Sequence, residues 1–157
     1  MIDPDIIDLV VKTHIDQEAD YTSNTIKETY PDGLDVEVFT FEALKEAWLN
    51  AKLLSEREHV TPYIRKNDKF KKVSVENDKD LTSLRWTLDN KEDYEFLKEV
   101  FKRLYKQNKD FMTKDVLELL EKEPHLKDIN KCITRNEGYI KSLKNDKILD
   151  LDYIKED

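Results

Sequence analysis

The chain has 157 residues, a formal net charge of −8, 39% charged residues and 38% hydrophobic residues, with two Trp, seven Tyr and six Phe. This length and aromatic content suit one folded domain with a substantial core and exclude a disordered chain. The acidic balance argues against a general nucleic-acid binder, which needs a basic face to displace counterions from phosphates.

Three further features of the composition narrow the class of protein. A single cysteine, Cys132, excludes an intrachain disulfide framework. No apolar run approaches the ~18–20 residues of a membrane span and no signal peptide opens the chain, so we expect no membrane segment and a cytoplasmic location. The only glycines are Gly33 and Gly138. Phosphate-binding loops need several glycines, so the sequence carries no such loop of its own.

The first predicted elements are a helix and a short strand. Residues 4–18 predict a helix, with Asp3 as N-cap, Pro4 at the first helical position and an apolar stripe that includes Val10 and His14. Residues 20–24 predict a short strand. No strand precedes the helix, although an α/β unit would place one there.

The segment Pro31 to Phe39, PDGLDVEVF, predicts a tight turn that leads into a strand. Alternation places Asp35 and Glu37 on one face of this strand, opposite the valines. Two carboxylates in this arrangement lie roughly 6.5–7 Å apart at ~3.3 Å rise per residue. That spacing suits sugar hydroxyls or a shared cation. The alternative is an ordinary half-buried strand with a solvated acidic face.

A helical region follows. Thr40 is predicted to cap a helix over 41–52 whose apolar face contains Phe41, Leu44, Ala47, Trp48 and Ala51. Ser55 and Glu58 predict a capping box, and Thr61 with Pro62 predicts a new helix start. Arg57, Glu58 and His59 also allow a catalytic interpretation, since a histidine can act as general base and a glutamate can orient it. The capping box already explains Glu58 and makes the catalytic interpretation the weaker of the two.

The next segments predict two strands and a helix. Residues 70–76 and 84–89 read as strands, and Asn90 is predicted to cap a helix over 91–106. Asp89 would then lie at the carboxyl end of a strand, where open α/β sheets bind ligands. Its alternative role is to cap the following helix. Arg85 would either hold a phosphate or pair with an acid.

The last part of the sequence predicts helices. Thr113 is expected to cap a helix that ends at Pro124, and a further helix is expected over 127–136 before a lysine-rich tail. The linker 105–110 divides the chain into an α/β part, 1–106, and a helical appendage, 107–157. Strands alternating with helices predict an α/β fold.

Six segments carry a resemblance to a known family. They occur in the order MIDPDII, DYTSNT, PDGLDVEVFTFEAL, REHVTPYI, LRWTLDNKEDYE and RNEGYIKSLKND. The series resembles the cytidylyltransferase family of the spore-coat polysaccharide biosynthesis type, related to acylneuraminate and KDO cytidylyltransferases. The resemblance implies a partial nucleotide-diphospho-sugar transferase (GT-A-like) fold. It also implies transfer of CMP from CTP to a sugar or sugar acid, with release of pyrophosphate and Mg²⁺ at the active site.

The resemblance further implies that this sequence is the C-terminal half of such an enzyme. Members begin with a Gly- and Arg-containing nucleotide loop and carry a Gly-Asp pair just before a segment like IDPDII, inside which Met1 stands. We therefore expect the isolated chain to be inactive in surface polysaccharide biosynthesis without that half. The alternative is a non-catalytic truncated module for sugar binding or oligomerisation. Because the family often dimerises through this half, we expect a homo-oligomer on either hypothesis.

The resemblance also assigns roles to individual residues. Asp89 matches the family's second metal-binding aspartate, with Asn90 and Lys91 in place of the usual Thr and Pro. Asp35 and Glu37 would line the sugar side of the cleft, and the REH segment would lie near the acceptor. The expected site comprises Arg57 and His59 as catalytic residues, Asp35, Glu37, Glu58 and Arg85 as substrate-binding residues, and Asp89 as a ligand of a Mg²⁺ site that this chain leaves incomplete.

Overall fold

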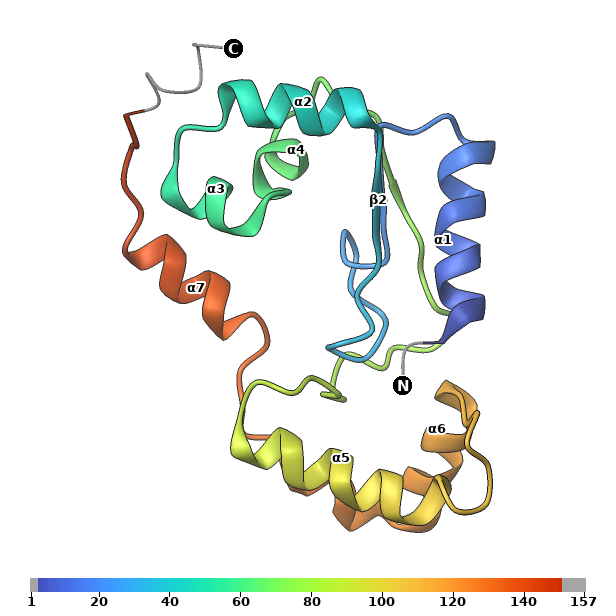
Figure 1. Cartoon of the computed structure of the whole chain (residues 1–157). Coiled ribbons are helices and arrows are strands. Elements are labelled where there is room, and N and C mark those ends of the chain that lie inside the picture. Colours follow the sequence, from blue (N-terminus) through green and yellow to red (C-terminus); the bar gives the residue numbers. More distant parts are fainter. Residues whose placement is uncertain (1–2, 151–157) are drawn as a thin grey trace.

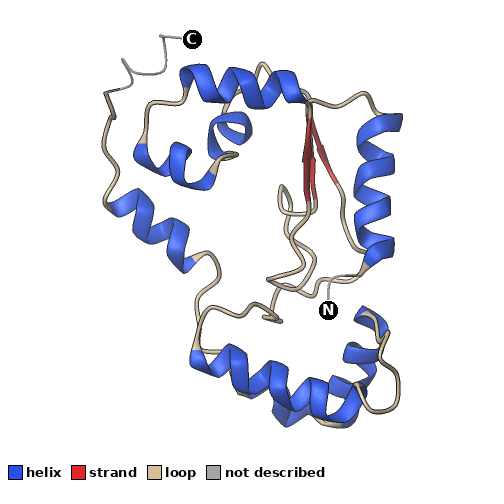
Figure 2. Ribbon diagram, viewed as in Figure 1, coloured by secondary structure: helices blue, strands red, loops and turns tan. Residues whose placement is uncertain are grey.

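The computed structural model describes residues 3–150, which form a mixed α/β structure around a small sheet (Figures 1 and 2). The sheet has the order β2-β1-β3, with β1 at Tyr21–Ser23, β2 at Glu37–Phe39 and β3 at Lys72–Ser74. β1 pairs antiparallel with β2 and parallel with β3. The α/β class is as predicted, whereas the GT-A-like topology stays a prediction.

Helix α1, Pro4–Asp16, lies along the sheet (Figure 1) and begins as predicted. The Asp3 side chain accepts a hydrogen bond from the Asp5 N–H at 3.1 Å. Val10 is fully buried, and Nδ1 of His14 lies 3.0 Å from the Thr22 hydroxyl of β1. His14 is therefore a packed residue that ties the helix to the sheet.

Helices α2 (Phe41–Asn50), α3 (Leu54–His59) and α4 (Pro62–Lys66) follow β2. Thr40 caps α2 as predicted, because its hydroxyl accepts from the Ala43 N–H at 3.1 Å. The predicted apolar face of α2 is only partly correct. The helix buries Ala43 and Ala47, whereas Phe41 is 71% exposed.

The predicted capping box of α3 is wrong. Leu53 occupies the N-cap position, and the Glu56 carboxylate accepts from the Leu53 N–H at 3.2 Å. Ser55 instead donates its hydroxyl to Asp146 at 2.7 Å, a contact between segments far apart in the sequence. Thr61 precedes Pro62 at the start of α4 as predicted, but its side chain makes no capping hydrogen bond.

The predicted strand over 84–89 is also wrong. Arg85 forms a single isolated bridge with Asp32, made by the hydrogen bonds from Asp32 N to Leu84 O (2.9 Å) and from Trp86 N to Asp32 O (2.7 Å). Pairing stops there because the partner backbone is a turn. Helix α5, Lys91–Leu104, begins after Asn90 and ends before residue 106.

The C-terminal elements are α6 (Thr113–Lys122), the 3₁₀ helix η1 (Pro124–Asp128) and α7 (Glu137–Lys144). Met112, not Thr113, is the N-cap of α6, and its N–H donates to the Asp115 carboxylate at 2.7 Å. The helix predicted over 127–136 is wrong, since η1 ends at Asp128. A helix lies instead in the lysine-rich tail, after the left-handed Asn136 (φ +58°).

Two hydrophobic clusters hold the structure together. The smaller one joins Tyr21 of β1 to α2, Ile64 and Phe70. The larger one contains Leu34, Leu84, Trp86, Phe96, Val100, Phe111, Val116, Leu119, Leu120 and Leu126. It draws on both sides of the boundary predicted at 106 and 107, and the division into domains stays a prediction. Along residues 3–150 no helix is both long and apolar enough to cross a membrane.

Candidate functional site

The PDG turn, which the sequence predicted, fixes the start of the site. Gly33 has φ +97°, and a Cβ on it would lie 2.8 Å from Thr87 N and from Trp86 C. Only glycine fits this conformation and this close backbone approach. The turn therefore packs directly against the segment before α5 and presents Asp32 to it.

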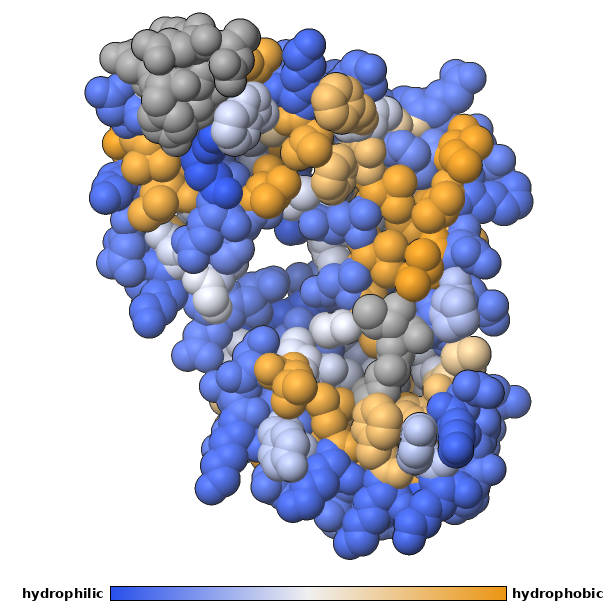
Figure 3. All heavy atoms as spheres, in the orientation of Figure 1, coloured by the Kyte–Doolittle hydropathy of each residue, from blue (hydrophilic) through white to orange (hydrophobic). Residues whose placement is uncertain are grey.

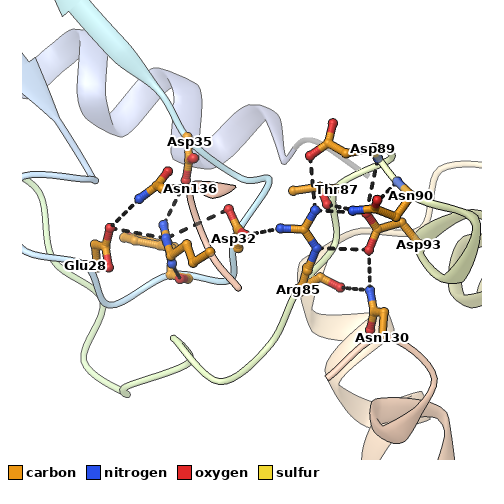
Figure 4. Close-up of polar contacts among 12 residues, drawn as sticks. Glu28, Asp32, Asp35, Arg85, Thr87, Asp89, Asn90, Asp93, Asn130 and Asn136 are labelled. Atoms are coloured by element: carbon orange, nitrogen blue, oxygen red, sulfur yellow. Dashed lines mark hydrogen bonds and ion pairs between the residues drawn. The ribbon is translucent and has the colours of Figure 1, made fainter. Parts of the chain in front are cut away.

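Arg85 is surrounded by three carboxylates (Figure 4). Its guanidinium donates to Asp32 at 2.7 Å, to Asp89 at 3.1 Å and to both oxygens of Asp93 at 3.0 Å. The Arg85 and Asp32 side chains are 9% and 8% exposed, and Asp93 is fully buried. Of the two roles left open for Arg85, the structure shows the one in which it pairs with acids.

The Asp93 carboxylate is held in its charged form. Burial alone raises the pKa of Asp93, but the hydrogen bonds from Arg85, Asn130, the Asp89 N–H and Thr87 outweigh it. The pKa of Asp93 therefore lies well below its ordinary value of 3.8. Asn90 is the N-cap residue of α5 as predicted, and the Asp93 carboxylate accepts from the Asn90 N–H at 3.2 Å.

A second arginine, Arg135, also pairs with Asp32. It pairs with Glu28 at 3.2 Å, with Asp35 at 3.1 Å and with Asp32 at 3.8 Å, and it donates to the Tyr30 carbonyl at 3.2 Å. Asp32 therefore connects the two arginine clusters. Arg135 fixes the segment before α7 against the PDG turn.

A cavity of about 250 Å³ opens beside this cluster. Its lining residues come from the turn, β2, α3, α4 and the start of α7: Thr25, Glu28, Asp35, Glu37, His59, Thr61, Pro62, Arg65, Arg135, Asn136 and Tyr139. Figure 3 shows a hollow in this part of the molecule with mainly hydrophilic surface around it. The cavity unites three predicted site residues, Asp35, Glu37 and His59.

Glu37, at the start of β2, and Asp35, two residues before it, lie in different surroundings. Glu37 accepts hydrogen bonds from Tyr21 and, at 2.9 Å, from Thr61. Burial raises the pKa of Tyr21, and the hydrogen bond and charge of Glu37 raise it further. Burial also raises the pKa of Asp35, and the nearby acids add to this rise, while Arg135 acts in the opposite direction.

Helix α7 orients the REH segment. Nε2 of His59 lies 3.0 Å from the Ser142 hydroxyl, and its ring packs edge-to-face on Tyr139 with 5.1 Å between centroids. The same Ser142 hydroxyl donates to Glu58 at 2.6 Å. Glu58 is therefore not a capping residue, and it lies next to His59 beside the cavity.

Two groups of predicted site residues lie elsewhere. Arg57 stacks over the Trp48 ring at 4.3 Å and borders an apolar groove of about 200 Å³, so the structure does not bring it to His59. Arg85 and Asp89 line a neighbouring cavity of about 570 Å³. That cavity shares Asp35 and Asn136 with the first one.

The surroundings of Asp89 do not make a complete magnesium site. Its side chain is 70% exposed. Within the described part of the chain, no group of three His, Cys, Asp or Glu side chains could hold a metal. The carboxylates of Asp32, Asp89 and Asp93 are instead paired with the Arg85 guanidinium. A metal-binding role of Asp89 stays a prediction.

Sequence reasoning missed several residues that build the site. The sequence pattern places Asp32 only within the PDG turn, and it assigns no site role to Asp93 or Arg65. Arg135 and Tyr139 lie in the quoted segment RNEGYIKSLKND, so that segment was the available signal. Its role depends on the packing of α7 against α3, which brings Tyr139 to His59.

Comparison with known proteins gives consistent matches. A family model described as cytidylyltransferase matches residues 1–121. An uncharacterized protein of Methanocaldococcus jannaschii is 36% identical over 140 residues, which cover 86% of this chain and 54% of that protein. The spore coat polysaccharide biosynthesis protein SpsF of Bacillus subtilis is 26% identical over 132 residues, covering 78% of this chain and 51% of SpsF.

One solved structure is similar as well. The structure of a cytidylyltransferase from Leptospira borgpetersenii serovar Hardjo-bovis matches with a TM-score of 0.74 and 33% identity, over 80% of this chain and 53% of that one. The chain thus spans about half the length of the curated relatives it matches.

Proposed function

Because the chain belongs to the cytidylyltransferase family, we propose that it forms the acceptor side of an enzyme that transfers CMP from CTP to a sugar or sugar acid and releases pyrophosphate. The observation that carries this proposal is the cavity of about 250 Å³ in which Asp35, Glu37 and His59 meet. Carboxylates accept hydrogen bonds from hydroxyls, and a cavity lined by such polar groups suits one ligand rich in hydroxyl groups.

The side chains that line the cavity would have different roles in CMP transfer. In CMP transfer an acceptor oxygen attacks the α-phosphorus of CTP in line, the bond to pyrophosphate breaks, and the acceptor loses a proton. Asp35 and Glu37 would orient the acceptor hydroxyls. His59 would exchange the proton through its ring, held by Ser142 and Tyr139.

We extend the proposal to the nucleotide and the metal. The sequence contains no glycine-rich phosphate loop. We therefore propose that polypeptide outside this sequence supplies the phosphate cradle, in agreement with the greater length of the relatives. Asp89 would contribute one carboxylate oxygen to Mg²⁺, an ion that neutralises triphosphate charge when bound. Its other oxygen ligands would come from the nucleotide and from that polypeptide.

The biological setting is proposed from the relatives and the surface. SpsF is named for spore coat polysaccharide biosynthesis, and we propose that this chain also serves the synthesis of a surface polysaccharide. Apolar surface gathers over α1 and α2 (Figure 3). Among the apolar residues of these two helices, Ile15, Phe41 and Trp48 are 66%, 71% and 52% exposed. Such surfaces are typical of association, and we propose that the chain forms a homo-oligomer.

A pyrophosphate-release assay tests the function. The chain is incubated with CTP, Mg²⁺ and candidate sugars or sugar acids, alone and together with a supplied half that carries the nucleotide loop. We expect release only from the combination. Release of pyrophosphate from the isolated chain would contradict the proposal that the phosphate cradle lies outside this sequence. No release from any combination would contradict the activity and favour a non-catalytic module.

Matched variants locate the acceptor site in the same assay. Glu37→Gln keeps the size of the side chain and removes the charge that faces the cavity. Glu121→Gln makes the same change on an exposed acid of α6, outside the cavity. We expect the first substitution to raise KM for the acceptor and the second to leave it unchanged. Equal effects would contradict the assignment of the cavity.

A further inference from the structure

The backbone between α3 and α4 is strained at Val60. This residue has φ +67° and ψ −56°, and the Thr61 N–H donates to the His59 carbonyl at 2.7 Å. These values describe a γ-turn with positive φ, which is rare. A β-branched residue in this region is a genuine outlier. Strain of this kind persists only where the surrounding structure imposes it, and it gathers at functional sites.

The two residues beside Val60 both face the proposed acceptor cavity. His59 and Thr61 line it, and the Thr61 hydroxyl holds Glu37 at 2.9 Å. In a helix, residues two apart point to different sides. The tight reversal at Val60 instead allows both neighbours to enter the same cavity.

Val60 itself points away from that cavity. It borders the apolar groove of about 200 Å³ on the other side, together with Leu44, Trp48 and Arg57. Its side chain is 47% exposed. Burial of Val60 therefore offers only partial compensation for the strain, and the turn must be maintained by the contacts of its neighbours with Glu37, Ser142 and Tyr139.

We propose that Val60 is a positioning residue, whose strained turn aims His59 and Thr61 together at the acceptor cavity. The identity of the cavity as an acceptor site rests on the function proposed above, but the conformational role of Val60 does not. Val60 acts through its neighbours and touches no ligand. Thr61 in turn fixes the Glu37 carboxylate, so the turn sets the relative placement of an imidazole and a carboxylate.

Two variants that both remove the valine side chain separate the effect of backbone strain from the loss of side-chain packing. Glycine accepts positive φ without strain, whereas alanine does not. Val60→Gly and Val60→Ala both empty the same part of the groove. We expect Val60→Gly to have an unfolding equilibrium constant about 5- to 30-fold smaller than that of Val60→Ala, measured by urea denaturation. Equal constants, or a less stable glycine variant, would overturn the proposal.

NMR spectroscopy tests the orientation of the His59 side chain without an activity assay. The contact between His59 and Tyr139 should shift the ring signals of both residues in NMR spectra, and Tyr139→Leu identifies that shift. We expect Val60→Gly to keep the shift. Val60→Pro, with φ fixed near −65°, should lose it while the far-UV spectrum stays unchanged.

These measurements can contradict the role of Val60 independently of the proposed enzymatic activity. Retention of the ring shift in a folded Val60→Pro variant would overturn the positioning role. If that variant does not fold, the glycine and alanine pair decides the question alone. Because neither measurement uses CTP or an acceptor, failure of the proposed activity would leave these results intact, and their failure would leave the activity assay to stand separately.

Discussion

Asp32 and Arg85 form a buried ion pair across 53 residues of sequence, with 2.7 Å between Oδ2 and Nη1. The pair joins the PDG turn to the segment before α5, and Gly33 makes the backbone contact beside it. Arg85 also pairs with the buried Asp93. One guanidinium thus pairs with two buried carboxylates, which makes it the central charge of this region.

Removal of the Arg85 charge should be strongly destabilising. In Arg85→Met, Asp32 and Asp93 remain buried with one cation fewer, and such uncompensated charges cost about 3–5 kcal/mol. We expect the free energy of unfolding to fall by this amount in urea denaturation. Lys102→Met is the control, because its pair with Glu99 lies at the surface and contributes about 0–1 kcal/mol. Similar losses from the two variants would contradict the special role of Arg85.

The depressed pKa of Asp93 predicts a specific loss of stability in acid. An acid whose pKa is lower in the folded state stabilises the fold fully above its unfolded value, here 3.8. That contribution is lost as the pH falls below 3.8 towards the folded pKa. We expect the difference in unfolding free energy between the wild type and Asp93→Asn to narrow from pH 5 to pH 3. A constant difference would show that the Asp93 charge is not preferentially stabilised.

The sequence predicted local features well where one residue decides the geometry. The N-cap of α1 at Asp3, the cap of α2 at Thr40 and the PDG turn are all present. Such features depend on side chains that bond to their own neighbouring backbone. A short motif therefore contains all the information that these elements need.

The errors came from contacts between distant segments. Ser55 fits a capping box locally, but Asp146 accepts its hydroxyl from 91 residues away. The segment 84–89 has the alternation of a strand, yet only a turn lies beside it. Likewise, Arg57 and His59 are two residues apart on α3 and face different cavities, because residues two apart on a helix point to different sides. Periodicity does not contain this tertiary information.

The two glycines provide a matched pair of alanine substitutions. Gly33→Ala places a Cβ at 2.8 Å from backbone atoms at a φ of +97°, so we expect a loss of at least about 1–3 kcal/mol in unfolding free energy. Gly138→Ala meets nothing within 4 Å in α7 and should stabilise by up to about 0.5–1 kcal/mol. Thermal denaturation of both variants provides the measurement. If Gly138→Ala lowered the unfolding free energy as much as Gly33→Ala, the special requirement for glycine in the PDG turn would be contradicted.

Asp35 predicts a pH dependence of opposite sign to that of Asp93. An acid with a raised pKa binds its proton more tightly in the folded state, so its charge weakens folding above the folded pKa. This penalty disappears as the pH falls through the folded pKa towards 3.8. Asp35→Asn should therefore be more stable than the wild type at pH 7, and this difference in stability should vanish below pH 3.8. Asp110→Asn, an exposed acid outside the cavity, is the control in the same denaturation series.

His59 and Arg57 offer the sharpest test of the site, because they are close in sequence but their side chains line different cavities. His59 lines the acceptor cavity, whereas Arg57 stacks on Trp48 in the apolar groove. In pyrophosphate release with the nucleotide-loop half supplied, His59→Gln should lower kcat/KM by about tenfold or more, the equivalent of one lost hydrogen bond to the reacting groups. Arg57→Gln should leave kcat/KM within about twofold, since its guanidinium reaches no cavity residue. If Arg57→Gln proved the more damaging change in a folded protein, the groove on Trp48 would be the functional surface and the cavity would not.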